Sequence, residues 1–205
     1  NPGGMAIYET QGWTLFERHD ETVPMWCSFA FSPDGAMLAS AGNDGWVRFR
    51  SVRASWAEPL PPIQVGRYAT AVAFSPDGRR IAVGAKREAN ECCCAVYDLG
   101  SRQEVAEVSG HATEVELAAF LPSGHGLLTL ISEKGDWLGS LKLWDLRAPS
   151  VPLHLPARGP RHAETAISKD GKHVFAAWSD GSVERWRVGE RGATLDGLFP
   201  PLLAA

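Results

Sequence analysis

The sequence predicts an all-β fold, a β-propeller built from four-stranded antiparallel blades. A turn motif recurs four times, beginning at Phe31, Phe74, Phe120 and Ile167, with spacings of 43, 46 and 47 residues. Apolar runs of β-type residues flank each turn, and no segment keeps a helical period between caps. Repeats of this length indicate one supersecondary unit copied along the chain, each copy burying its apolar face on its neighbours.

Each turn has a chemistry that reverses a strand tightly. Proline fixes φ, aspartate supplies a short acceptor side chain, and glycine tolerates a positive φ. The motif reads Phe-Ser-Pro-Asp-Gly at 31–35 and 74–78, and departs from this at 120–124 (Phe-Leu-Pro-Ser-Gly) and 167–171 (Ile-Ser-Lys-Asp-Gly).

Three strands are predicted in each unit, and a more variable stretch can supply a fourth, outer strand. A polar turn separates the second and third strands, most clearly at 43–45 and 179–181. The expected strands are 26–31, 37–40 and 46–50; 71–74, 81–83 and 95–98; 115–120, 127–130 and 141–145; and 165–167, 174–177 and 182–186, with outer strands around Val105, Leu153 and Leu195. Four short antiparallel strands per unit are typical of a propeller blade.

The predicted organisation is one propeller segment over residues 1–205, with about four and a half blades. The blades are expected at 22–62, 63–109, 110–155 and 156–199, after a half-blade at 5–19 that reads as the third and fourth strands of a further blade. The first residues are Asn1-Pro2-Gly3-Gly4, with no starting methionine or apolar leader. We therefore expect a fragment of a larger, for example seven-bladed, propeller, covalently continuous with further blades or another domain upstream.

Two dipeptides in the third unit resemble the signature of a known family. Gly110-His111 opens this unit and Trp144-Asp145 ends its third strand, as in WD40-repeat (β-transducin-like) proteins. Phe49-Arg50, Tyr97-Asp98 and Trp186-Arg187 hold the Trp-Asp positions elsewhere. TolB-like periplasmic repeats, which share Ser-Pro-Asp-Gly turns, remain an alternative but lack both dipeptides.

The resemblance implies a structural hydrogen-bond network of His111, Thr129, Asp136 and Trp144 in the third unit. Counting from the turn places Thr129 at the position of Ser40 in the first unit, whereas an insertion near 133–139 makes the aspartate harder to assign. A catalytic triad is the alternative, but no nucleophile elbow accompanies these residues. A buried, satisfied network that specifies one packing is favoured.

Composition and charge indicate neither a nucleic-acid partner nor a membrane partner. The formal net charge is −4 and the isoelectric point is about 5.9. Phosphate-binding surfaces need clustered lysine and arginine, and here the basic residues are scattered. No apolar stretch approaches 18 residues.

The cysteines indicate no metal site and no cofactor. Cys92-Cys93-Cys94 lie together, with Cys27 far away. Adjacent strand residues point to opposite faces, so Cys92 and Cys94 share a face while Cys93 does not, and the sequence has no second cysteine pair to complete a zinc site. We expect small apolar fillers of a strand, and the adjacent thiols favour a reducing, cytoplasmic location. Phosphate-loop, dinucleotide and zinc-protease motifs are absent from the sequence, so a non-enzyme is predicted.

Binding is the remaining function, and we place it on the loop face around the propeller axis. The position six residues before each turn lies at the lip of a first strand, and loops between second and third strands add to the same face. Tyr68 and Arg161 at the lip and Trp137 in a loop are hot-spot types, and we hypothesise that they form one patch for a peptide or protein segment; alternatively, Tyr68 or Trp137 fills a gap between blades. The full candidate set is Met25, Tyr68, Glu114 and Arg161 at the lip and Asn43, Arg87 and Trp137 in the loops.

The favoured function is a non-catalytic scaffold or regulatory module that binds protein. The alternative is a sensor or substrate-docking propeller fused to a kinase or NTPase outside this segment. A small-molecule site in the central channel is a third reading, although the small residues Ala69, Ala71, Ala118 and Ala119 suggest close strand packing instead.

Overall fold

The computed structural model describes residues 5–9, 14–19, 26–52, 57–88, 91–132, 139–148, 152–155, 162–189 and 192–200. Every regular element in these ranges is a β-strand, as the sequence predicted. None of the described segments is a helix long and apolar enough to cross a membrane.

The strands form four sheets of four and one sheet of two, all antiparallel. The two-stranded sheet contains β1 (Met5–Glu9) and β2 (Thr14–His19). The first blade is β3 (Trp26–Phe31), β4 (Met37–Gly42), β5 (Trp46–Ser51) and β6 (Ile63–Gln64); the second is β7 (Tyr68–Phe74), β8 (Arg80–Lys86), β9 (Cys92–Asp98) and β10 (Glu104–His111); the third is β11 (Val115–Phe120), β12 (Gly126–Ser132), β13 (Gly139–Asp145) and β14 (Leu153–Leu155); the fourth is β15 (His162–Ile167), β16 (His173–Trp178), β17 (Val183–Gly189) and β18 (Gly192–Phe199).

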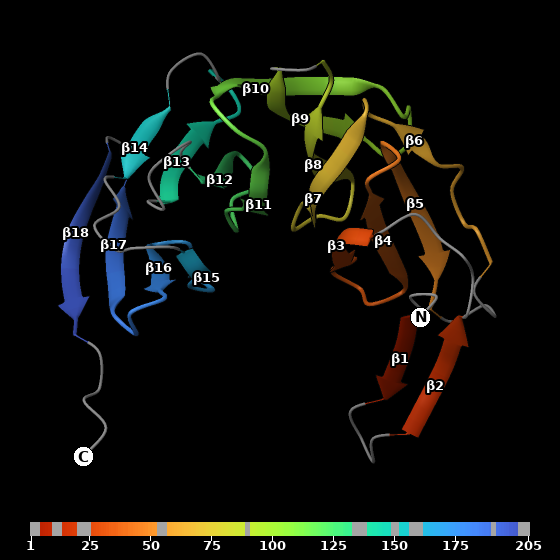
Figure 1. The fold of residues 1–205 in the computed structure, drawn as a ribbon, viewed down its shortest axis with the longest axis horizontal. Helices are drawn as coiled ribbons and strands as arrows, with labels where there is room; N and C mark the ends of the chain where they lie inside the picture. Colours follow the sequence, from red (N-terminus) through yellow and green to blue (C-terminus); the bar gives the residue numbers. More distant parts are fainter. Residues whose placement is uncertain are drawn as a thin grey trace.

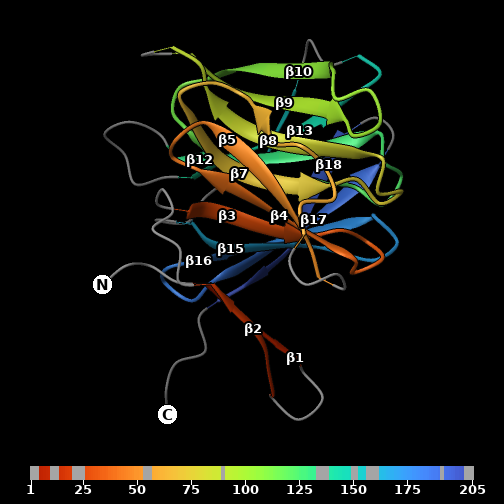
Figure 2. The same cartoon turned by 90° about the vertical axis from the view of Figure 1, so that its right-hand side faces the viewer.

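The four blades follow one another around an open arc (Figure 1). The first strand of each blade, β3, β7, β11 or β15, lies on the inner side of the arc, and β6, β10, β14 and β18 lie on the outer side. The hairpin of β1 and β2 projects from the body of the arc, which is seen from its side in Figure 2. This arrangement confirms the propeller architecture and the fourth strands expected around Val105, Leu153 and Leu195.

The turns of the first, second and fourth blades, which share the pattern Ser-x-Asp-Gly, are closed by the same hydrogen bonds. In the second blade the Ser75 hydroxyl donates to Asp77 Oδ1 at 2.5 Å, and the Arg79 N–H donates to the same oxygen at 3.1 Å. Gly78 has a φ of 68°. Hydrogen bonds from Ser75 and from the Arg79 backbone lower the pKa of Asp77 below its usual value, so the carboxylate stays charged in the turn. The sequence motif is therefore a self-contained turn.

Each first strand carries a β-bulge at the same place. The register with the second strand shifts at the residue four positions before the leading apolar residue of the turn. The bulged residues, at which the register shifts, are Cys27, Thr70, Glu116 and Ala163. A bulge bends the strand and shifts the pairing of the residues beyond it by one position along the neighbouring strand. It thereby sets which side chains meet at the lip of every blade.

Hydrophobic cores fill the spaces between neighbouring blades. One cluster joins the first and second blades, a second joins the second and third and contains Trp144, and a third joins the third and fourth and contains Trp186. Inner strands are also linked directly, because Thr70 Oγ1 donates to the Val115 carbonyl at 2.7 Å. The four alanines considered for a channel site, Ala69, Ala71, Ala118 and Ala119, belong to these inter-blade clusters or pack against them. These alanines take part in the close packing between the strands.

Two outer strands extend beyond the expected blade limits. The pair Ile63–Gln64 bonds to β5 and so belongs to the first blade, which was expected to end at 62. In the second blade, β10 continues to His111, which pairs with Cys92, two residues past the limit expected at 109. Outer strands are half-exposed and have no apolar period, so their ends leave little trace in a sequence.

The Trp-Asp position of the first blade is Arg50-Ser51, not Phe49-Arg50. Leu38 pairs with Arg50 in the first blade as Leu127 pairs with Trp144 in the third. Phe49 instead packs toward the second blade, in the cluster between the two. Successive side chains of a strand point to opposite faces, so Phe49 and Arg50 face opposite ways. The prediction was wrong by one residue because Phe49 is the aromatic residue nearest to this position.

Candidate interaction surface

Three side chains from two blades gather at the end of the sheets where the first strands begin. Tyr68 starts β7, Lys86 ends β8, and Glu114 lies between β10 and β11. The Lys86 ammonium lies 5.7 Å from the centroid of the Tyr68 ring and 2.9 Å from Glu114 Oε1. The hydrogen bond to Glu114 raises the pKa of Lys86, so the ammonium form of Lys86 is favoured. We call these three residues the Tyr68 surface.

The structure brings together only part of the predicted binding set. Tyr68 and Glu114 meet through Lys86, whereas Asn43 lies in the β4–β5 turn, partly buried. The Arg87 guanidinium turns to the outer strand and pairs with Glu104 and, at 2.8 Å, with Glu107. The charge of Arg87 is therefore paired with these two glutamates, away from the Tyr68 surface. Met25, Trp137 and Arg161, together with Asp136 of the expected network, lie outside the described residues.

The sequence analysis missed Lys86 because of the β-bulge. Counting back from the turn in the register of Phe74 and Ile81 would place Tyr68 opposite Arg87. The shift at Thr70 instead pairs Tyr68 with Lys86. Thr70 Oγ1 donates 2.7 Å to the Val115 carbonyl, and no feature of one repeat taken alone indicates that contact.

A buried hydrogen-bond network lies behind this end of the second and third blades. Trp144 Nε1 donates to Thr129 Oγ1 at 2.9 Å, and His111 Nε2 lies 3.0 Å from the same oxygen. Lys142 Nζ donates to the Gly110 carbonyl at 2.9 Å. The backbone of His111 belongs to the second blade, while its side chain bonds to the third. The network therefore joins two blades and holds the connection that carries Glu114.

This network predicts a pH dependence of stability. Burial, aided by the charge of Lys142, lowers the pKa of His111 from about 6.5 to about 4. Between these two pKa values His111 is protonated in the unfolded chain but neutral in the folded chain. The contribution of neutral His111 to the free energy of unfolding is therefore complete above pH 6.5 and is lost as the pH falls toward 4. We expect the free energy of unfolding to fall by about 2 kcal/mol between pH 7 and pH 5. Urea titrations at both values should show this loss, and the variant His111→Gln should lack most of it. An equal loss of unfolding free energy between pH 7 and pH 5 in both proteins would contradict the prediction.

The three described cysteine side chains lie side by side on one strand and are all buried. Cys92, Cys93 and Cys94 are buried thiols on β9, as expected for apolar fillers. Burial raises the pKa of Cys93 to about 12, which suppresses the nucleophilic thiolate. Within the described ranges, no three histidine, cysteine, aspartate or glutamate side chains cluster with the geometry of a metal site.

Comparisons with known proteins agree with this fold. A family model described as "WD domain, G-beta repeat" matches residues 11–51. Transducin-like enhancer protein 2 of Mus musculus is 27% identical over 63% of the chain, and WD repeat-containing protein SL1-17 of Schistosoma mansoni is 27% identical over 70%. Target of rapamycin complex subunit wat1 of Schizosaccharomyces pombe is 25% identical over 77%. The chain spans 17%, 44% and 47% of these three proteins, respectively.

One solved structure with the same fold has a longer chain. A chain of the crystal structure of the mitotic checkpoint complex superposes on 99% of the present chain with a TM-score of 0.75 at 16% identity. The match covers 62% of that longer chain. At this identity the likeness concerns the fold alone.

Proposed function

Because the chain belongs to the WD40-repeat family, we propose that it is a non-catalytic interaction scaffold that binds a peptide or protein segment on the Tyr68 surface. The observation that carries this proposal is the convergence of Tyr68, Lys86 and Glu114 from two blades. A tyrosine offers a large contact area and a hydroxyl at low entropic cost, which is why it is enriched at binding hot spots.

The charges of this surface favour a segment that is polar on both sides of an anchoring residue. Lys86 and Glu114 are a half-exposed pair, with 24% and 47% of their side chains accessible, so a partner can compete for either charge. The strands beneath are held by inter-blade cores and by the Thr129 network, which makes the surface rigid. A preformed surface loses little conformational entropy on binding.

The names of two similar proteins support a role in assemblies. One relative is named a subunit of the target of rapamycin complex, and the superposed structure is that of the mitotic checkpoint complex. Since the chain spans under half of each relative, we propose that further blades complete the propeller, and that any fused domain is regulated by it. A cytoplasmic location suits the buried thiols and is tested by imaging a fluorescent fusion.

Replacing Tyr68 by alanine tests the proposed surface. A photo-crosslinking residue in place of the exposed Arg67, next to Tyr68, identifies the partner. Calorimetric titration then compares the purified partner's affinity for the wild-type chain and the Tyr68→Ala variant. We expect the dissociation constant to rise at least about tenfold, as for a tyrosine hot spot.

The matched control is Lys172→Ala, which removes an exposed side chain at the other end of the fourth blade. Affinity should be unchanged in this variant. If Tyr68→Ala keeps the wild-type affinity and a native circular dichroism spectrum, the proposed surface is wrong.

A further inference from the structure

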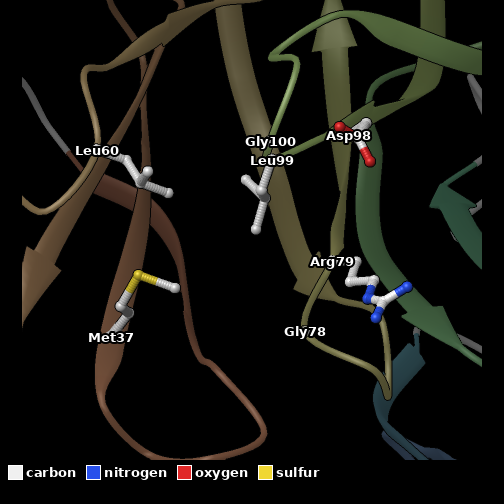
Figure 3. A pocket seen from close by; sticks show the side chains of 7 residues that line it. All are labelled: Met37, Leu60, Gly78, Arg79, Asp98, Leu99 and Gly100. Carbon is white, nitrogen blue, oxygen red and sulfur yellow. The ribbon is translucent and has the colours of Figure 1, made fainter.

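A pocket opens between the first and second blades at the end of the sheets opposite the Tyr68 surface. It has a volume of about 420 Å³. Figure 3 shows its lining residues, which are Met37, Leu60, Gly78, Arg79, Asp98, Leu99 and Gly100. Tyr68 begins β7 and Gly78 follows its end, so a seven-residue strand, about 20 Å long, separates the two surfaces.

Three apolar side chains from separate segments form one wall of the pocket. Met37, Leu60 and Leu99 point toward one another (Figure 3). The segment after Leu60 is fixed in place, because the Arg102 guanidinium donates to the carbonyls of Pro61 and Pro62 at 2.5 and 2.7 Å. Arg102 has a φ of 62°, in the left-handed region that is unfavourable for its residue type. The pocket is therefore preformed, and its apolar wall fits an aliphatic side chain.

Arg79 gives the rim a positive charge, which acts on the nearby carboxylates of Asp77 and Asp98 and helps to lower the pKa of each. Its side chain is exposed and makes no hydrogen bond or ion pair within the part of the chain that the structure describes. Asp98 is held by its own turn, since the Ser101 N–H and hydroxyl donate to Oδ1 at 2.7 and 2.9 Å and lower the pKa of that carboxyl. Asp77 is likewise bound by Ser75. The guanidinium is thus the rim group with donors to spare, and its planar fork matches a carboxylate.

The two glycines of the lining favour a peptide over a small molecule. Gly78 and Gly100 present bare backbone beside the apolar wall, so the main chain of a ligand can approach closely. The Gly78 N–H already donates to the Ser75 carbonyl and the Gly100 N–H to the Asp98 carboxylate, so the glycine carbonyl oxygens are the groups left to accept from a peptide N–H.

We propose that this pocket binds an extended peptide segment of a partner protein, with a leucine-sized side chain against Met37, Leu60 and Leu99 and a neighbouring acidic side chain paired with Arg79. The second, third and fourth blades have Arg79, His125 and Lys172 after their turn glycines, and the first has Ala36. Arg79 alone stands beside this apolar wall. This site is separate from the Tyr68 surface, so either can fail without the other.

Methyl resonances of the chain labelled with ε-13C-methionine provide a direct test. The chain has three methionines, and Met37→Leu assigns the resonance at the pocket. The probe is the peptide acetyl-Gly-Ser-Leu-Glu-Ser-Gly-amide, titrated to millimolar concentration. We expect a saturable shift of the Met37 resonance that disappears when serine replaces the leucine of the peptide, and an affinity about tenfold weaker in the Arg79→Gln variant.

Lys172→Gln is the matched control, because it removes the same charge after the corresponding turn glycine of the fourth blade and should leave the affinity unchanged. Sodium octanoate is the second probe, since it joins an apolar chain to a carboxylate without a peptide backbone. An unmoved Met37 resonance with the peptide, equal binding by Arg79→Gln, or saturation by octanoate alone would each overturn the proposal.

Discussion

Thr129→Val should lower the free energy of unfolding by about 3 kcal/mol. The valine keeps the shape of the side chain but removes the oxygen that Trp144 Nε1 and His111 Nε2 share. Thr129 is fully buried, and His111 and Trp144 are 5% and 2% exposed, so water cannot replace the lost partner. A buried polar group left without a hydrogen bond costs about 1–3 kcal/mol, and here two groups are affected. Urea denaturation monitored by tryptophan fluorescence measures the change.

Ser40→Ala is the matched control for this experiment. Ser40 pairs with Arg48 as Thr129 pairs with Lys142, so the two hydroxyls occupy equivalent positions in their blades. The Ser40 hydroxyl donates a long hydrogen bond of 3.5 Å to the Arg48 carbonyl. We expect a loss of under about 1 kcal/mol. Equal losses from the two substitutions would mean that the network contributes nothing beyond an ordinary buried hydroxyl.

Short-range chemistry made much of this fold readable from the sequence. A Ser-Pro-Asp-Gly turn closes through bonds among its own residues, such as Ser75 with Asp77, and needs no help from the rest of the chain. Repetition then reveals the blade, because each apolar run is placed by its distance from a turn. The grouping of His111, Thr129 and Trp144 was also accessible, since a family signature fixes their relative positions.

Features set by contacts between blades were not readable in this way. The bulge at Thr70, whose hydroxyl reaches the Val115 carbonyl, decides whether Lys86 or Arg87 meets Tyr68. Such a contact joins residues 45 positions apart. The pocket beside Arg79 has the same origin, because its lining comes from four separated segments of two blades. A sequence read one repeat at a time contains no signal for surfaces of this kind.

Gly45→Ala should be as damaging as the loss of the buried network, for a different reason. Gly45 has a φ of 80°, and a Cβ there would lie 1.9 Å from the Gly66 carbonyl oxygen and 2.8 Å from its carbon. The Val65 N–H donates to the Gly45 carbonyl at 2.9 Å, so the two backbones are held in direct contact. A left-handed conformation costs an alanine about 1–2 kcal/mol, and the overlap with backbone adds about as much again. We expect the free energy of unfolding to fall by about 3 kcal/mol.

Gly35→Ala separates the two parts of that cost. Gly35 has a φ of 67°, but a Cβ there meets nothing within 4 Å, so only the conformational part applies and the loss should be about 1 kcal/mol. Both variants are compared by urea denaturation. Only Arg67 separates Gly66 from Tyr68 along the chain. Gly45→Ala should therefore also weaken partner binding at the Tyr68 surface, whereas Gly35→Ala should leave that binding unchanged. Equal unfolding free energies for the two variants would show that the turn of the first blade moves away from Gly66 at no cost. Unchanged partner affinity in Gly45→Ala would show that the contact does not position Tyr68.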